Sequence, residues 1–129
     1  GYNKHYYDKK VYFMQNIQIW HNPKCSKSRS ALELLQSKDI NANVVEYLKT
    51  APTKEELTDV LLKLKISAKE LLRTSEDIYK ELNLKDTNDE EKLIEIMIKN
   101  PILIERPIII KDDIAVIARP IENLNELLK

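Results

Sequence analysis

The chain has 129 residues, which suits one domain around one core. Its 21 basic side chains balance 21 acidic ones, so its charge does not indicate a surface for nucleic acid or another polyanion. No apolar run approaches the roughly 20 residues of a membrane span and no signal-peptide pattern is present, which predicts a soluble, cytoplasmic protein without membrane contact.

The first segment, residues 1–13, is rich in tyrosine and lysine and ends just before Met14. We interpret Met14 as the native start and residues 1–13 as an added leader; the alternative is a native extension that is disordered. We therefore expect a single domain over residues 14–129.

The next residues predict a strand, a helix and a second strand. Residues 17–20 alternate in polarity, residues 26–37 place apolar side chains on one helical face, and residues 43–47 are rich in valine. A strand, a helix and a strand within about thirty residues form a βαβ unit, whose strands are parallel.

Several helices are predicted to follow. Three pairs of residues have the spacing of a capping box, in which two side chains satisfy the exposed amides at a helix start: Thr53 with Glu56, Ser67 with Glu70, and Thr87 with Glu90. The helices expected in this part cover residues 53–65, 67–73, 75–82 and 88–99.

The last part of the chain returns to β-branched residues. Residues 102–104, 107–110 and 114–118 are predicted to be extended, with a hairpin turn at Asp112-Asp113 and a final helix over 121–128. The complete order, β-α-β, several helices, then β-β-α, predicts an α/β protein with a thioredoxin-like mixed sheet and a helical insert after the second strand.

Cys25 is the only cysteine and follows directly on the first predicted strand, at the start of a helix. Helix N-termini and basic neighbours lower the pKa of a thiol, and basic residues surround Cys25 while no acid lies between His21 and Ala31. The sequence therefore predicts a redox-active thiolate, with a small buried cysteine as the alternative. A single cysteine also leaves no thiol cluster for a structural metal, and any disulfide chemistry must take its second sulfur from another molecule.

Two residues near Cys25 are candidates to support the thiolate. Ser28 falls on the same helix face and can turn its hydroxyl toward the sulfur, or it is simply a residue of the helix start. His21 ends the strand and can orient or electrostatically support the thiolate, or it is a hydrogen-bonded histidine without a catalytic role.

Glycine and arginine are both scarce. Gly1 is the only glycine, which excludes a phosphate-binding P-loop and a Rossmann fingerprint. Of the 21 basic residues only four are arginine, and three of these, Arg73, Arg106 and Arg119, lie far from Cys25 in the sequence. Arginine pairs with oxyanions through two parallel hydrogen bonds, which lysine cannot copy. We therefore predict a shared anion site, although a surface salt bridge or a helix C-terminal cation is the alternative for each arginine.

Four motifs in order resemble the glutaredoxin-linked arsenate reductases. They are His-Asn-Pro-x-Cys-x-x-Ser-Arg after the first strand, Leu-Leu-Arg, Asn-Pro-Ile-Leu-Ile-x-Arg-Pro-Ile, and Ala-x-x-x-Arg-Pro, and they extend from about Ile17 to Pro120. One departure is Ser26, where the best-known members carry glycine.

The resemblance implies a role for each candidate residue. Cys25 would be the nucleophile that attacks arsenate, with His21 and Ser28 favouring its thiolate. Arg73, Arg106 and Arg119 would bind the oxyanion, and Pro107 would be the cis-proline of thioredoxin-like folds.

The reaction that the resemblance implies is reduction of arsenate, or a similar oxyanion, to arsenite through a covalent thiol–arsenate adduct. Glutathione would act as co-substrate and glutaredoxin as partner, with no bound cofactor or metal and a monomeric chain. Two other functions stay open. One is a redox-sensing transcriptional regulator that binds RNA polymerase, although such regulators carry Cys-x-x-Cys and position 28 is serine. The other is a glutathione-dependent thiol oxidoreductase without arsenate activity, which would have little use for three arginines.

Overall fold

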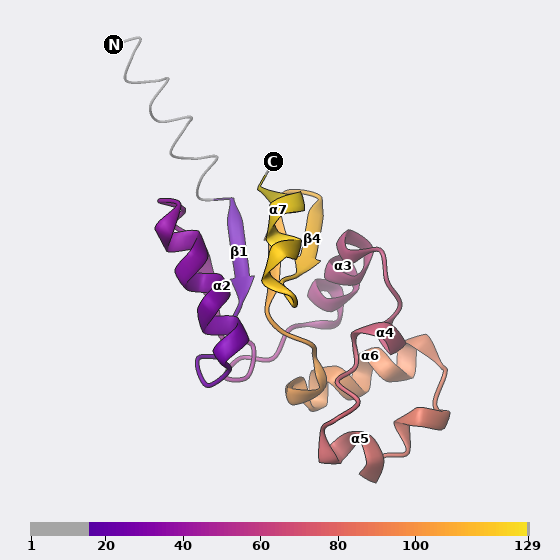
Figure 1. The fold of residues 1–129 in the computed structure, drawn as a ribbon. Coiled ribbons are helices and arrows are strands. Elements are labelled where there is room, and N and C mark those ends of the chain that lie inside the picture. Colours follow the sequence, from indigo (N-terminus) through magenta and orange to yellow (C-terminus); the bar gives the residue numbers. More distant parts are fainter. Residues whose placement is uncertain (1–15, 129) are drawn as a thin grey trace. The chain divides into compact units, whose positions relative to one another are not determined.

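Four short strands of the computed structural model, which describes residues 16–128, form one mixed sheet (Figure 1). They are β1 (Ile17–Trp20), β2 (Asn43–Val45), β3 (Ile108–Lys111) and β4 (Ile114–Ile117), in the order β2-β1-β3-β4. The predicted leader, residues 1–13, lies outside the described residues. The mixed sheet with its βαβ start and ββα end confirms the predicted fold class.

The first two strands form the predicted parallel pair. Trp20 at the end of β1 is paired with Val45 at the end of β2, and α2 (Ser26–Ser37) connects the two strands. The strand predicted over 43–47 is two residues too long, because β1 ends at Trp20 and gives β2 no strand to pair with beyond Val45. The last backbone bond of this pair runs from the N–H of His21 to the carbonyl of Val45 at 2.9 Å. Beyond Val45 the chain leaves the sheet.

The other two strands form the predicted hairpin. β3 pairs antiparallel with both β1 and β4, and Lys111 and Ile114 close the hairpin around the turn at Asp112-Asp113. Asp112 has a φ of 54°, in the left-handed region that aspartate tolerates better than most residues.

One face of this sheet is covered by helices at the two ends of the chain. The helices are α2 and α7 (Leu124–Leu127), the latter preceded by the 3₁₀ turn η3 (Ile121–Asn123) where a single helix over 121–128 is predicted. Figure 1 shows α2 running beside β1. The core below these helices consists of eight buried residues: Ile17, Ile19, Ala31, Leu35, Ile109, Ala118, Leu124 and Leu127.

The chain divides into two compact units. One comprises the described residues up to Glu46 together with those from Arg106 onward, and it contains the whole sheet. The other, Tyr47–Glu105, is helical. Its elements are α3 (Lys54–Leu64), α4 (Ala68–Leu71), α5 (Asp77–Glu81), η1 (Leu84–Asp86), α6 (Glu90–Lys99) and η2 (Pro101–Leu103). That residues 14–129 form a single domain stays a prediction.

Two of the three predicted capping boxes are confirmed, those of Thr53 with Glu56 and Ser67 with Glu70. The third, Thr87 with Glu90, is wrong. α6 begins at Glu90, so its cap is Asp89, whose carboxylate accepts from the backbone N–H of Lys92 at 3.3 Å. The Thr87 hydroxyl instead donates to the carbonyl of Asn83 at 3.1 Å. Glu90 accepts from the N–H of Ala68, 3.0 and 3.1 Å from its two oxygens, and so adds a second acceptor at the start of α4.

The strand predicted over 102–104 is also wrong. Residues 101–103 instead form the 3₁₀ turn η2. Pro101 occupies its first position, where proline favours the start of a helical turn. Only Ile104 is extended, and it forms an isolated antiparallel bridge with Leu72.

Candidate active site

The register of the sheet brings three separate segments together at one edge. Trp20 and Ile108 are the last paired residues of β1 and β3. Continuing this register by one residue places His21 opposite Pro107. On the other side of Pro107, its carbonyl accepts from the backbone N–H of Ala118 at 2.9 Å. The segment that leads from His21 to Cys25 therefore starts at the edge where β3 begins and β4 ends. Arg106 and Arg119 adjoin those two strand ends.

Cys25 is the N-cap residue of α2 and has extended backbone angles. Its N–H donates to the carbonyl of Asn22, and its carbonyl accepts from the N–H of Arg29, both at 3.0 Å. The Asn22 side chain accepts from the N–H of Lys24 at 3.0 Å, and Arg29 Nη1 donates to the carbonyl of Pro23 at 2.9 Å. These four bonds fix the turn that carries the sulfur.

The pKa of the Cys25 thiol lies below its ordinary value. Burial alone would raise the pKa, but the thiolate accepts hydrogen bonds from the backbone N–H of Ser28, from Arg106 and from the N–H of Lys27, and the charge of Arg106 acts in the same direction. The two N–H groups belong to the first turn of α2, where they lack partners within the helix. The direction of this shift agrees with the position of Cys25 at a helix start, while its role as a redox-active thiolate stays a prediction.

A second arginine also contacts the sulfur. Arg119 Nη2 donates to Cys25 Sγ at 3.3 Å, and Arg119 is half-buried, as are Arg106 and Cys25. Both arginines precede a cis peptide bond, to Pro107 and to Pro120. Two guanidinium groups, one from each strand at the open end of the β3–β4 hairpin, thus serve one sulfur.

The Ser28 side chain does not support the sulfur in the way that its helix position predicts. Its hydroxyl lies 2.6 Å from His21 Nδ1 and accepts from the N–H of Asn22 at 3.0 Å. Ser28 is completely buried, so these bonds hold the hydroxyl on the side of His21, and it is the Ser28 backbone N–H that supports the thiolate.

His21 is buried, and its pKa is lowered from its ordinary value. Burial is the main cause, the charge of Glu46 opposes it, and the charge of Arg29 adds to it. The imidazole is therefore neutral at neutral pH and carries no positive charge to attract the thiolate. Its contact with the Ser28 hydroxyl links it instead to the backbone of the Cys25 turn.

Arg73 belongs to the helical unit. Its Nε donates to Glu76 at 3.2 Å and its Nη1 donates to Glu105, and only 12% of its side chain is exposed. Burial lowers the pKa of Arg73, but the two carboxylates outweigh it and hold the pKa above its ordinary value. That Arg73 binds an oxyanion stays a prediction, as do the roles assigned to the other site residues.

Several residues of this arrangement were not among the predicted site residues. Asn22 precedes a proline and has the side chain of an Asx turn, a local signal that marks it as a turn residue. Glu76 and Glu105 carry no such signal, because their partner Arg73 is identified only by the fold. Arg29 lies within the first motif, but its bond to the Pro23 carbonyl depends on the shape of the turn.

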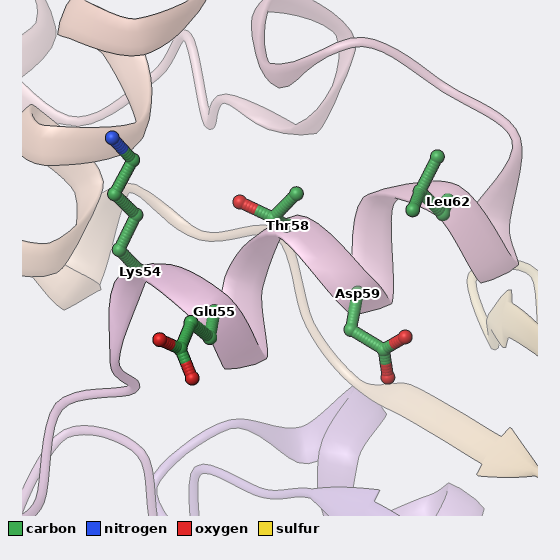
Figure 2. Close-up of a pocket in the computed structure, with 5 residues that line it drawn as sticks. All are labelled: Lys54, Glu55, Thr58, Asp59 and Leu62. Carbon is green, nitrogen blue, oxygen red and sulfur yellow. The ribbon is translucent and has the colours of Figure 1, made fainter.

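Three other kinds of feature were sought in the described residues: a metal site, a membrane span and a pocket. Residues 16–128 contain no group of three or more His, Cys, Asp or Glu placed to hold a metal ion, and none of their helices is both long and apolar enough to cross a bilayer. A pocket of about 510 Å³ is lined by Lys54, Glu55, Thr58, Asp59 and Leu62. Figure 2 shows that all five project from α3, and all are exposed, so no buried polar group is directed into the pocket.

The comparisons with known proteins agree on one family. The sequence profile described as the ArsC family matches residues 20–127. The chain is 44% identical to a Neisseria meningitidis protein named arsenate reductase over 117 residues, which are 89% of this chain and 100% of that one. It is 46% identical to the Escherichia coli protein YfgD, described as uncharacterized, over 88% of this chain and 98% of that one. The solved structure of an arsenate reductase from Vibrio cholerae aligns with a TM-score of 0.83 and 41% identity, covering 85% of this chain and 95% of that one.

Proposed function

Because this chain belongs to the ArsC family, we propose that it is an oxidoreductase that reduces arsenate to arsenite with Cys25 as the nucleophile. The observation that carries the proposal is the Arg119–Cys25 contact, in which a guanidinium donates to a sulfur whose pKa is already lowered. A thiolate beside arginine donors suits attack on an oxyanion. The thiolate supplies the nucleophile, and the arginines attract the anion and stabilise the negative charge on its oxygens.

In the first step the Cys25 thiolate attacks arsenic. An S–As bond forms, and one As–O bond breaks with loss of hydroxide, which leaves as water once it is protonated. Arg106 and Arg119 bind the remaining oxygens, and Arg73 is the third proposed ligand on the strength of its motif. His21 and Ser28 hold the turn of Cys25, so the sulfur stays aligned with the backbone N–H groups of α2.

In the second step glutathione, as co-substrate, supplies the other sulfur. Its thiolate attacks Cys25 Sγ, an S–S bond forms and the S–As bond breaks, and the electron pair of that bond stays on arsenic. Arsenic is thereby reduced from the +5 to the +3 state while two thiols are oxidised to one mixed disulfide. The sequence contains one cysteine, so an intramolecular disulfide within it is not available for this step.

In the third step glutaredoxin regenerates the enzyme. A glutaredoxin thiolate attacks the glutathione sulfur of the mixed disulfide, and Cys25 leaves as a thiolate, which its lowered pKa makes a good leaving group. We further propose that the protein works as a monomer in the cytoplasm, where glutathione is kept reduced, and that it needs neither a bound cofactor nor a metal.

Arsenate reduction in the presence of glutathione and glutaredoxin tests this proposal. We expect the wild type to be active, Cys25→Ser to be inactive, and Arg106→Ala to lose about 100-fold in kcat/KM, the typical cost of removing one donor to an oxyanion. Lys24→Ala is the matched control. Lys24 is exposed beside Cys25, so the variant removes one positive charge without removing a contact to the sulfur.

The same experiment separates the other functions. A wild type that does not reduce arsenate under any of these conditions excludes the proposal. If that protein instead reduces a glutathione mixed disulfide in a Cys25-dependent and Arg106-independent way, it is a thiol oxidoreductase. If it does neither and binds RNA polymerase subunits in a pull-down, it is a regulator.

A further inference from the structure

The chain makes one tight turn between β1 and α2. The N–H of Cys25 donates to the carbonyl of Asn22 at 3.0 Å, which closes a four-residue turn with Pro23 and Lys24 at its centre. Lys24 is not one of the four described residues with a positive φ, so the turn is not type II, which needs a positive φ at its third position. Type I, the commonest type, favours asparagine first and proline second, as here. Residues 22–25 therefore form a type I turn.

The central peptide group of this turn, between Pro23 and Lys24, is held at both ends. Its N–H donates to Asn22 Oδ1 at 3.0 Å, and its carbonyl accepts from Arg29 Nη1 at 2.9 Å. A trans peptide group is a rigid plane whose N–H and carbonyl point in opposite directions. Because one side chain binds each end, the two bonds together fix the orientation of the plane.

This orientation is what distinguishes type I from type II. The two types differ mainly by a rotation of the central peptide group through roughly half a turn, which changes ψ of the second residue and φ of the third. The rotation would reverse the N–H and the carbonyl, so the bonds to Asn22 and Arg29 would both be lost. Lys24 opposes the rotation as well, because a residue with a Cβ disfavours a positive φ. Three side chains therefore oppose the same rotation.

The turn leads directly to the residue that carries the sulfur. Cys25 is the last residue of the turn and the N-cap of α2, with a φ of −97° and a ψ of 122°. In this conformation its thiolate accepts from the N–H groups of Ser28 and Lys27. Arg29 also binds the cap through its own backbone N–H, which donates to the Cys25 carbonyl at 3.0 Å. A change in the turn is therefore passed on to Cys25.

We propose that Arg29 is a positioning residue, whose guanidinium holds the central peptide group of the turn in the type I orientation and so keeps Cys25 at the cap of α2. The inference rests on the proposed function and deepens it, because it assigns to the fourth arginine the alignment of the proposed nucleophile. All the residues involved belong to the unit that contains the sheet. The role requires no contact between Arg29 and the oxyanion.

The alternative is a purely electrostatic role. Arg29 is exposed, and its positive charge near the turn would by itself favour the thiolate. The two roles differ in their dependence on the residue at position 24. A charge effect is the same whether that residue is alanine or glycine. A positioning effect is larger with glycine, which adopts a positive φ readily and so removes the obstacle that the Lys24 Cβ provides.

The test uses four variants of the full chain: Lys24→Ala, Lys24→Gly, and each of these combined with Arg29→Met. Methionine keeps the unbranched stem and the helix propensity of arginine but removes its donors. Alkylation of Cys25 by iodoacetamide is measured against pH, and folding is checked by circular dichroism and urea unfolding. We expect Arg29→Met to raise the alkylation midpoint only slightly in the Lys24→Ala background. In the Lys24→Gly background we expect a rise of about 1 pH unit, as the loss of hydrogen bonds to the thiolate implies.

An equal or smaller rise in the Lys24→Gly background means that Arg29 acts through its charge and overturns the proposal, and so does the absence of a rise in both backgrounds. Lys24 and Arg29 are both exposed, so their replacement leaves the core intact. If a Lys24→Gly variant nevertheless does not fold, Lys24→Asn replaces it under the same criteria, since asparagine also tolerates a positive φ.

Arsenate kinetics separate positioning from anion binding. In the Lys24→Gly background we expect Arg29→Met to lower kcat by up to about tenfold, the loss of thiolate that a rise of one pH unit implies. KM should stay unchanged, because Arg106 and Arg119 are intact. A raised KM with an unchanged kcat would make Arg29 an anion ligand and overturn the proposal. If the wild type does not reduce arsenate, the proposed function fails, while the alkylation comparison still decides the role of Arg29.

Discussion

The Ser28 hydroxyl lies 2.6 Å from His21 Nδ1, and both residues are almost fully removed from solvent. The same hydroxyl accepts from the N–H of Asn22, so one buried oxygen joins the end of β1, the turn and the first turn of α2. The support of this pair for Cys25 is therefore indirect: it holds the backbone whose N–H groups face the sulfur.

Replacing Ser28 by alanine leaves two buried polar groups without this partner. We expect Ser28→Ala to lower the free energy of unfolding by about 1–3 kcal/mol, the usual cost of unsatisfied buried groups, as measured by urea denaturation. Ser26→Ala, at the exposed first position of α2, is the control and should change stability little. Alkylation of Cys25 by iodoacetamide, measured against pH, has a midpoint that reports the pKa of the thiol. This midpoint should rise less in Ser28→Ala than in Arg106→Ala, because the Ser28 backbone N–H remains. An equal shift would argue for a direct role of the hydroxyl.

The lowered pKa of His21 predicts a pH dependence of stability. The folded protein favours the neutral imidazole, so below the ordinary histidine pKa of about 6.5 the unfolded chain binds more protons. Stability should therefore fall as the pH drops from about 6.5 through the lowered pKa. His21→Asn keeps a hydrogen-bonding group toward Ser28 but cannot titrate. The wild-type curve of unfolding free energy against pH should be steeper than the variant curve in this window, and parallel curves would contradict the expectation.

Arg119 should control the reactivity of Cys25 at neutral pH. Arg119→Ala removes the donor that lies 3.3 Å from the sulfur, and we expect the alkylation midpoint to rise by about 1 pH unit. Arg119→Lys keeps the positive charge but loses the planar guanidinium. Compared with Arg119→Ala, it should therefore recover part of the lowered Cys25 pKa but little of the arsenate reduction. Lys24→Ala again controls for the loss of a charge near the turn. Full activity in Arg119→Lys would show that charge alone is sufficient.

Lys69 should be important for the stability of the helical unit. Its Nζ donates to three backbone carbonyls, those of Leu84 at 2.7 Å, Lys85 at 2.9 Å and Thr87 at 2.7 Å. Lys69→Met keeps most of the side-chain length and removes all three bonds. We expect a loss of about 2 kcal/mol or more, because hydrogen bonds to charged groups contribute more than neutral ones. Lys63→Met, which removes the helical pair with Asp59, should cost less than about 1 kcal/mol. Equal losses in urea denaturation would refute this account.

Local signals in the sequence predict much of the fold. The alternation of Ile17–Trp20, the capping boxes at Thr53 and Ser67 and the turn at Asp112 each depend on residues close in sequence, and all three are found. The capping box at Thr87 fails because Asp89 is an equally good cap closer to the helix. A spacing of three residues does not by itself decide where the helix begins.

The candidate site is predictable only in part, for a related reason. Cys25, Arg106 and Arg119 stand out because cysteine and arginine are rare here, and the structure brings these three together. Glutamate is common, so neither Glu76 nor Glu105 stands out, and their bonds to Arg73 depend on the pairing of segments 71–73 and 103–105. Burial likewise decides the charge of His21, and no pattern in the sequence gives its extent.

The hairpin of β3 and β4 has a consequence for the spacing of Arg106 and Arg119. Ile108 faces Ile117, and Pro107 is bonded to Ala118, so Arg106 and Arg119 occupy facing positions one step further along. The number of residues in the turn at Asp112-Asp113 therefore sets which side chain stands opposite Arg106, although the turn is at the other end of the hairpin. A single inserted residue there would shift one strand against the other and place Ala118 or Pro120 across from Arg106. Turn length is thus a means of changing the spacing between the two arginines without altering either of them.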